Sequence, residues 1–222
     1  MAGKLIVLEG VDASGKTTQY DLLQERLRSD GIPFRPITFP CYDSPSSAPV
    51  RMYLDGQFGR HPEDVNAYAA SALYAVDRFA SYKTDWGPWY ADGGFVLAAR
   101  YTTSNAVHQA PKLAPGERED YLSWLYELEF DRMGLPRPDR VLFLDVPPEV
   151  SLRLLRSRRE QNGQKDIHED DPAYLRHCYD AAVAAAEHYG WIRVHCTRDG
   201  EMRSRQEIAD ELYAYVLETL KK

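Results

Sequence analysis

The chain of 222 residues contains little cysteine and no long apolar segment. Cys41, Cys178 and Cys196 are its only cysteines and show no CxxC spacing, so neither a disulfide framework nor a zinc site is indicated. No apolar run approaches the roughly 18 to 20 residues that span a bilayer, and the apolar N-terminal stretch is too short for a signal peptide. We therefore expect a reduced, cytoplasmic protein.

An excess of basic residues is missing as well. Lysine and arginine total 27 against 34 aspartates and glutamates, which gives a formal net charge of -7 at pH 7. A broad surface for a nucleic-acid polymer or an anionic membrane would need the opposite sign, although a local basic pocket is compatible with this charge. We expect neither a nucleic-acid polymer nor a membrane as a partner.

Short apolar runs alternate with helical patterns along the chain. The runs cover residues 5–8, 34–39, 95–99, 141–144 and 191–195. Helical spacing of apolar residues is found at about 17–27, 62–82, 120–131, 150–158, 172–188 and 208–220. Continuous apolar runs are typical of strands covered on both faces. We predict a single α/β domain over residues 1–222, with a five-stranded parallel sheet and helices on both faces.

The segment GVDASGKT at 10–17 matches the phosphate-loop pattern GxxxxGK[ST], and it directly follows a strand and opens a helix. Glycines let the backbone curl so that several N–H groups point at one phosphate, next to the positive end of the helix. Lys16 can reach the β- and γ-phosphates, and the Thr17 hydroxyl can bind Mg²⁺. A glycine-rich turn with an exposed lysine is the plainer interpretation. We predict an ATP site formed by Gly10, Val11, Asp12, Ala13, Ser14, Gly15, Lys16, Thr17 and Thr18.

Phosphate loops serve several classes of protein. A switch GTPase would normally carry an NKxD-type motif, and none is present. An ATPase would need a carboxylate at the end of an apolar strand, for which Asp145 is the formal candidate, although Asp145 could equally be structural. A small-molecule kinase would instead need several arginines that converge on two phosphorylated substrates.

That last pattern is present, and with it the chain resembles the thymidylate kinase family over nearly its whole length. The resemblance is carried, in the family's order, by LEGVDASGKTTQ (8–19), FP (39–40), LYAVDRF (73–79), RYTTSNAVHQ (100–109) and LFLDVPPEVSLRL (142–154). It implies a P-loop NTPase fold with a small lid at about 156–171. It also implies a homodimer that uses ATP and Mg²⁺ to phosphorylate dTMP to dTDP, a step of dTTP synthesis.

The resemblance also implies roles for single residues near the loop and the base. Asp12 would lie near the sugar 3′-hydroxyl and the phosphates, and Glu9 would orient the loop or, with Thr17, serve the metal ion. Tyr74 would stack on thymine and Arg78 would hydrogen-bond it. These two are spaced i, i+4, so both can face one cleft. Packing in the core is the alternative for Tyr74, as it is for Phe39, which could line the same pocket.

Arg100 ends an apolar strand, where a charge is costly unless it is paired. The resemblance implies that its partner is the phosphate of dTMP rather than another residue, and a guanidinium suits a phosphate because it can donate two parallel bonds. Ser104 and Asn105 would face the base. The sugar side would be lined by Tyr101, His108 and Gln109, with a structural role as the alternative for His108.

Some members of the family carry a transition-state arginine in the phosphate loop, and others carry it in the lid. The loop position here is Ala13, so the lid must supply it. We favour Arg156 and Arg159 as catalytic residues beside Lys16, Asp12 and Arg100. Arg153 would lie on the same helix face, and a solvated basic face is the alternative.

Two positions depart from the family's pattern. Ala99 stands where an acidic residue usually precedes the arginine, and Cys41 stands where an arginine often follows FP. Other carboxylates could serve the metal ion, or the enzyme could be slow. A kinase for another nucleotide or deoxynucleoside, or a degenerate relative that binds ATP and dTMP without phosphoryl transfer, remains an alternative.

Overall fold

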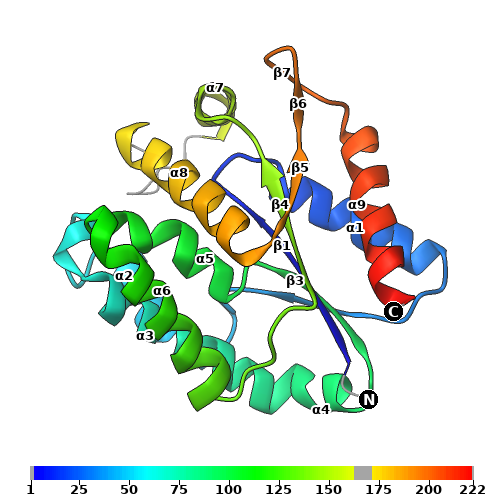
Figure 1. Cartoon of the computed structure of the whole chain (residues 1–222), viewed down its shortest axis with the longest axis horizontal. Helices are drawn as coiled ribbons and strands as arrows, with labels where there is room; N and C mark the ends of the chain where they lie inside the picture. The colour runs from blue at the N-terminus through cyan, green and yellow to red at the C-terminus, as the bar shows by residue number, and fades with distance from the viewer. Residues whose placement is uncertain (1–2, 163–171, 222) are drawn as a thin grey trace.

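The computed structural model describes residues 3–162 and 172–221 of the chain (Figure 1). Five strands form one parallel sheet in the order β2-β3-β1-β4-β5. They are β1 Lys4–Gly10, β2 Arg35–Thr38, β3 Phe95–Ala99, β4 Arg140–Asp145 and β5 Ile192–His195. This confirms the predicted parallel sheet, and both ends of each strand lie within two residues of the ends of the expected apolar run.

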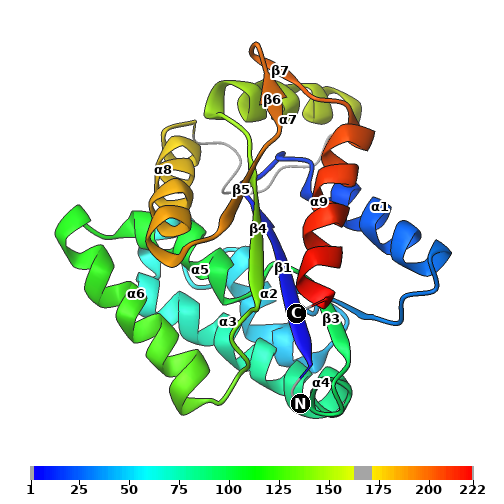
Figure 2. The same cartoon turned by 45° about the vertical axis from the view of Figure 1, so that its right-hand side comes forward.

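Helices cover both faces of the sheet. Figure 2 shows α1 and α9 on one side, with α3, α5, α6 and α8 on the other. The helices are α1 Lys16–Ser29, α2 Ala48–Leu54, α3 Ala67–Ser81, α4 Gly87–Ala91, α5 Thr102–His108, α6 Arg118–Tyr126, α7 Pro148–Asn162, α8 Pro172–Tyr189 and α9 Arg205–Leu220. Two π-helical segments, Tyr82–Trp86 and Glu127–Arg132, extend α3 and α6, and a small hairpin pairs β6 Thr197–Arg198 with β7 Glu201–Met202.

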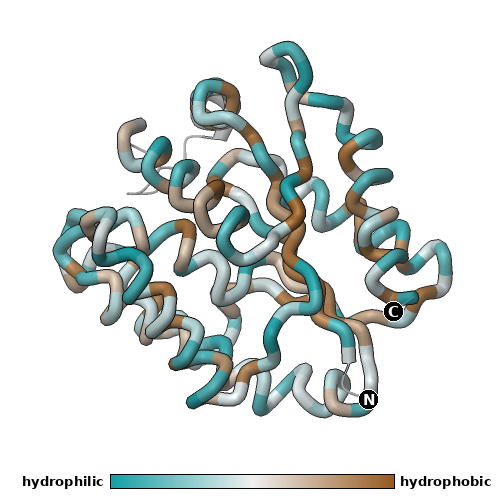
Figure 3. Tube along the Cα trace, in the orientation of Figure 1, coloured by the Kyte–Doolittle hydropathy of each residue, from teal (hydrophilic) through white to brown (hydrophobic). Residues whose placement is uncertain are grey.

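Two apolar layers explain why the strands have continuous rather than alternating apolar sequences. Side chains of a strand point alternately to opposite faces of the sheet. In β1, Leu5 and Val7 belong to the core cluster under α5 and α8, whereas Ile6 and Leu8 belong to the cluster under α1 and α9. All four side chains are fully buried. The apolar strands run through the middle of the molecule in Figure 3.

Several predicted helix boundaries were wrong. The helix expected at 62–82 begins only at Ala67, because the Asn66 side chain caps it by accepting a bond from the Ala69 N–H at 2.8 Å. The stretch 44–62, for which no helix was predicted, contains α2. The lid expected at about 156–171 begins within α7, and residues 163–171 lie outside the described part of the chain. None of the helices described is both long enough and apolar enough to cross a membrane.

The order of the strands brings two functional segments to one edge. β1 and β3 are parallel neighbours, with Leu8 opposite Ala99. The phosphate loop leaves the carboxyl end of β1, and Arg100 follows the carboxyl end of β3. In open parallel sheets this edge, between strands whose connections diverge, is where ligands bind.

Candidate functional site

The phosphate loop is shaped by its backbone. Ala13 and Gly15 have positive φ angles of 57° and 82°, which curl the chain before α1 begins at Lys16. Gly10 must lack a side chain, because a Cβ there would lie 2.5 Å from Ser14 Oγ. The Lys16 ammonium donates to the carbonyl oxygen of Gly10 at 2.9 Å. Lys16 is thus held across the mouth of the loop.

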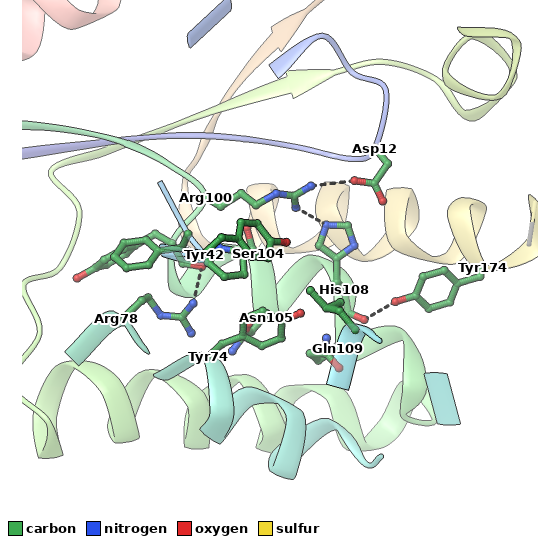
Figure 4. A pocket seen from close by; sticks show the side chains of 14 residues that line it. Asp12, Tyr42, Tyr74, Arg78, Arg100, Ser104, Asn105, His108, Gln109 and Tyr174 are labelled. Atoms are coloured by element: carbon green, nitrogen blue, oxygen red, sulfur yellow. Dashed lines mark hydrogen bonds and ion pairs between the residues drawn. The ribbon is translucent and has the colours of Figure 1, made fainter. Parts of the chain in front are cut away.

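Arg100 has two protein partners (Figure 4). Its Nη2 lies 2.8 Å from Asp12 Oδ1, and its Nη1 lies 2.8 Å from His108 Nε2. The prediction that the partner of Arg100 is a phosphate and not another residue is therefore wrong for this structure, in which Asp12 and His108 are its partners. The reason is the pairing of β1 with β3, which brings the loop that carries Asp12 within reach of a charge at the end of β3.

Burial and neighbouring charges tune these groups. Burial lowers the pKa of His108 to about 4, so the ring is neutral at pH 7 and its Nε2 accepts from Arg100. Burial also lowers the pKa of Lys16 to about 8. Burial alone would raise the pKa of Asp12, but the basic groups around it, including Arg100 and Lys16, bring that pKa well below its usual range. Asp12 is therefore a carboxylate.

Glu9 is fully buried behind the loop. Its Oε2 accepts from the hydroxyls of Thr103 at 2.7 Å and Ser104 at 2.6 Å, and its Oε1 accepts from the Gly10 N–H at 2.9 Å. These contacts fit the first of its two expected roles, which is to orient the loop. They also engage the Ser104 hydroxyl, which was expected to face the base.

A cavity lies beside the loop, between α3 and α5. All eight residues predicted for dTMP line it together with Tyr101 and Gln109: Asp12, Phe39, Tyr74, Arg78, Arg100, Ser104, Asn105 and His108. The cavity is also lined by four residues that were not predicted from the sequence: Pro40, Tyr42, Leu54 and Tyr174. Tyr174, near the start of α8, donates to the His108 carbonyl oxygen at 2.7 Å and so ties α8 to the cavity (Figure 4).

Three side chains that line the cavity differ in their packing and hydrogen bonding. Tyr74 is half-buried and meets Tyr53 edge to face, with ring centres 6.4 Å apart, and burial raises its pKa. Phe39 is nearly buried and packs on Tyr101, so it belongs to the core as well as to the cavity. The Gln109 side-chain carbonyl is buried and has no hydrogen-bond partner among the described residues.

Arg78 lies at the back of the cavity and is almost fully buried. Its Nε and Nη2 donate to the two carboxylate oxygens of Glu129, at 2.6 and 2.5 Å. Burial would lower the pKa of Arg78, but the Glu129 charge raises it. Glu129 was not predicted from the sequence, because its charged neighbours in ELEFDR are typical of a solvated helix face.

A second groove runs along the other side of the phosphate loop. Among the residues that line this groove, those predicted to bind ATP belong to the loop and the start of α1. Further lining residues were not predicted, and they come from α7, from β7, from the turn after β7 and from α9: Leu154, Ser157, Met202, Arg203, Ser204, Arg205 and Ile208. Asp12 and Arg100 line both this groove and the cavity, so the two spaces meet at their ion pair.

Of the arginines expected on or beside the lid, the structure describes the side chains of Arg153 and Arg156. Arg153 donates to the Gly200 carbonyl oxygen at 3.2 Å and pairs with Glu201 at 2.8 Å, so the β6–β7 hairpin holds it. Arg156 is exposed. The side chain of Arg159 lies outside the part of the chain that is described.

Asp145 is the candidate carboxylate for an ATPase, and its surroundings argue for a structural role. It is buried, and its Oδ2 pairs with Arg193 at 2.8 Å and with His195 Nδ1 at 3.0 Å. Its Oδ1 accepts from the Tyr179 hydroxyl at 2.9 Å. Both oxygens are thus engaged in holding β5 and α8 to the end of β4.

The donor groups at the loop fit a magnesium ion shared with a nucleotide. Within residues 3–162 and 172–221, no three His, Cys, Asp or Glu side chains form a group that could hold a metal ion on their own. Mg²⁺ commonly keeps several waters and takes one or two protein ligands together with substrate phosphates. Thr17, exposed at the first turn of α1, provides a hydroxyl of this kind.

The chain is similar to known proteins over most of its length. The family model for thymidylate kinase matches residues 8–207. Thymidylate kinase of Mycobacterium tuberculosis (strain H37Rv) is 32% identical over 190 residues, which cover 84% of this chain and 87% of that protein. Thymidylate kinase of Synechococcus sp. (strain RCC307) is 30% identical over 209 residues, 93% of this chain and 94% of the relative. A solved structure of thymidylate kinase from Candida albicans superposes with a TM-score of 0.72 at 20% identity, covering 99% of this chain and 93% of that one.

The buried imidazole gives a pH prediction. We expect His108 to stay neutral at pH 6, because burial lowers its pKa to about 4. An NMR titration of the ring should show this directly. The unfolded chain takes up the same proton at about pH 6.5, so this group's contribution to stability is complete above that pH and is lost as the pH falls towards 4.

A His108→Gln variant supplies the comparison. Between pH 6.5 and 4 the free energy of unfolding should fall more steeply in the wild type than in the variant. A ring that titrates near pH 6.5 in the folded protein would contradict the prediction.

Proposed function

The chain belongs to the thymidylate kinase family, and from this premise we propose how it transfers the γ-phosphoryl group of ATP to dTMP. The observation that carries the proposal is the convergence of all eight expected dTMP residues on one cavity. That cavity meets the groove of the phosphate loop at Asp12 and Arg100. The donor and acceptor phosphates therefore come together at this ion pair.

The loop holds the phosphates of ATP. Backbone N–H groups of residues 10–17 and the N-terminus of α1 bind the β-phosphate, and Lys16 places its ammonium between the β- and γ-phosphates. With a pKa of about 8, Lys16 is mainly protonated at pH 7 and supplies positive charge. Mg²⁺, held by Thr17 and the phosphates, would neutralise charge that develops during transfer.

Arg100 binds the acceptor phosphate. The phosphate of dTMP replaces protein groups as a ligand of the guanidinium, which already points into the cavity from the end of β3. Asp12 then accepts a hydrogen bond from the sugar 3′-hydroxyl. Catalysis of phosphoryl transfer consists mainly of positioning the substrates and neutralising charge, so these contacts account for most of the protein's contribution to catalysis.

The base lies against Tyr74 and Arg78. Tyr74 offers its ring for stacking, and Arg78 and Asn105 offer hydrogen-bond donors. The unpaired Gln109 carbonyl is also placed to accept from the ligand. His108 and Tyr101 lie on the sugar side. Glu9 supports this wall of the cavity through Ser104.

Three further features complete the proposal. A lid at about 156–171 supplies Arg156 and Arg159 to the transition state. The enzyme is cytoplasmic and forms a homodimer. The exposed apolar side chains of Tyr68 and Val76 on α3 support the homodimer. The polymeric nucleic acids and membranes that the net charge disfavours are not partners.

The choice of acceptor tests the proposed function. ADP release should be measured with dTMP, dUMP, dCMP, UMP and thymidine as acceptors. We expect turnover with dTMP. Preference for a nucleoside would favour a deoxynucleoside kinase, and binding of both ATP and dTMP without dTDP formation would favour a degenerate relative. ATP hydrolysis with no acceptor would favour an ATPase.

Lys16→Ala tests the donor side. We expect kcat to fall about 100-fold or more, because a charge that stabilises the transition state is lost. The affinity for dTMP, measured by calorimetry without ATP, should change little, since Lys16 does not line the acceptor cavity. Lys83→Ala, which removes an exposed lysine, is the control. Loss of dTMP binding together with turnover would contradict the assignment.

Ala99→Asp tests the missing carboxylate. Ala99 lines a groove together with Lys16 and Thr17, so a carboxylate there would lie near the metal ion and the phosphates. We expect kcat to rise about tenfold, equivalent to about 1.4 kcal/mol of transition-state stabilisation. Ala99→Asn has nearly the same shape without the charge and should not raise kcat. An unchanged or lower rate for Ala99→Asp would mean that the site is organised around alanine.

A further inference from the structure

Behind the cavity lies a buried carboxylate that the mechanism above does not use. Glu129 is fully buried, and it meets Arg78 in a bidentate ion pair in which both side chains are about 1% exposed or less. Charges are rarely buried so completely unless they are paired and hydrogen-bonded. The pair lies one residue layer behind the wall of the cavity, because Arg78 lines the cavity and Glu129 does not.

The ion pair determines which part of Arg78 faces a ligand. A guanidinium is a flat fork, and Glu129 occupies the edge formed by Nε and Nη2. The remaining nitrogen, Nη1, contacts only the Tyr101 carbonyl oxygen among the described residues, at 3.4 Å, the long limit of a hydrogen bond. Nη1 carries two hydrogens, so it has a donor to offer in the cavity.

The local backbone directs Glu129 inwards. It lies in the π-helical segment Glu127–Arg132, and such segments are often found at functional sites. The carboxylates on either side, Glu127 and Asp131, are exposed and pair with Arg132 and Arg137. Of these three carboxylates, therefore, only Glu129 points towards the cavity.

A third contact joins Glu129 to the helix that carries the rest of the site. The Thr102 hydroxyl donates to Glu129 Oε2 at 2.8 Å. Thr102 is the first residue of α5, from which Asn105 and His108 reach the cavity. Glu129 thus fixes Arg78 of α3 relative to the side chains of α5.

We propose that Glu129 is a positioning residue for base recognition, which holds Arg78 so that Nη1 donates to the carbonyl oxygen at C4 of the pyrimidine. The proposal rests on the proposed function. Thymine and cytosine share a carbonyl at C2 but differ at C4, where cytosine carries an amino group. A guanidinium has five donors and no acceptor, so it cannot pair with that amino group. Arg78 held in this orientation favours dTMP over dCMP.

The Glu129→Gln variant is the direct test. Dissociation constants for dTMP and dCMP are measured by calorimetry without ATP, and KM and kcat are measured for dTMP and ATP. We expect dTMP to bind about tenfold or more weakly, as for the loss of a hydrogen bond to a charged group. The preference for dTMP over dCMP should shrink by a similar factor, while the KM for ATP changes less than twofold.

Glu127→Gln is a matched control from the same segment. Glu127 also accepts two bonds from one arginine, Arg132, but both side chains are exposed. The control should leave the dTMP preference and the KM values unchanged. A merely structural role for Glu129 would lower the melting temperature without changing the ratio of the two dissociation constants.

A second variant tests the positioning role of Glu129 if Glu129→Gln does not fold. Thr102→Val removes one hydrogen bond to Glu129 and keeps the buried ion pair. It should reduce the preference for dTMP over dCMP by about threefold, less than Glu129→Gln does, because the ion pair that orients Arg78 remains. An unchanged preference in either folded variant would overturn the proposal. The dissociation constants need no turnover, so failure of the proposed function would appear separately, as absence of dTDP formation by the wild type.

Discussion

A positive charge at the carboxyl end of a buried strand must find a negative partner, and much of the site follows from that requirement. Arg100 leaves β3 beside the loop that leaves β1, and Asp12 in that loop pairs with it. The same contact closes the acceptor cavity on one side and the phosphate groove on the other. The parallel pairing of β1 with β3 therefore places both halves of a phosphoryl-transfer site around one ion pair.

Around this pair, burial sets the protonation of the other groups. The imidazole of His108 is kept neutral, so it can accept from Arg100 without adding a second positive charge beside Lys16. Glu9 lies below the loop, where two hydroxyls and a backbone N–H donate to its side-chain oxygens. Because interactions between charges are stronger away from water, a site built in this way is organised before a nucleotide arrives.

The sequence alone predicted the sheet and the phosphate loop, and the resemblance to the family supplied eight dTMP residues that line the acceptor cavity. The sheet and the loop depend on local patterns, such as the apolar runs of β1 and β4 and the GxxxxGK[ST] spacing. The sequence did not predict Glu129, Tyr174 or the lining residues between Met202 and Ile208. Tertiary packing brings them to the site from the π-helical segment after α6, from α8, and from the stretch between β7 and the start of α9. The sequence also did not predict α5, whose polar residues Thr102 to Asn105 face buried partners instead of solvent.

The backbone of Arg100 has a consequence for protein engineering. Its φ angle of 67° lies in the left-handed region, which costs a residue other than glycine roughly 1 to 2 kcal/mol. Glycine would relieve that cost but would remove the guanidinium on which both substrate spaces converge. A selection for heat resistance alone would therefore favour glycine or asparagine at this position, and a selection for activity would restore arginine. Position 100 is a place where stability and function cannot both be optimised by one side chain.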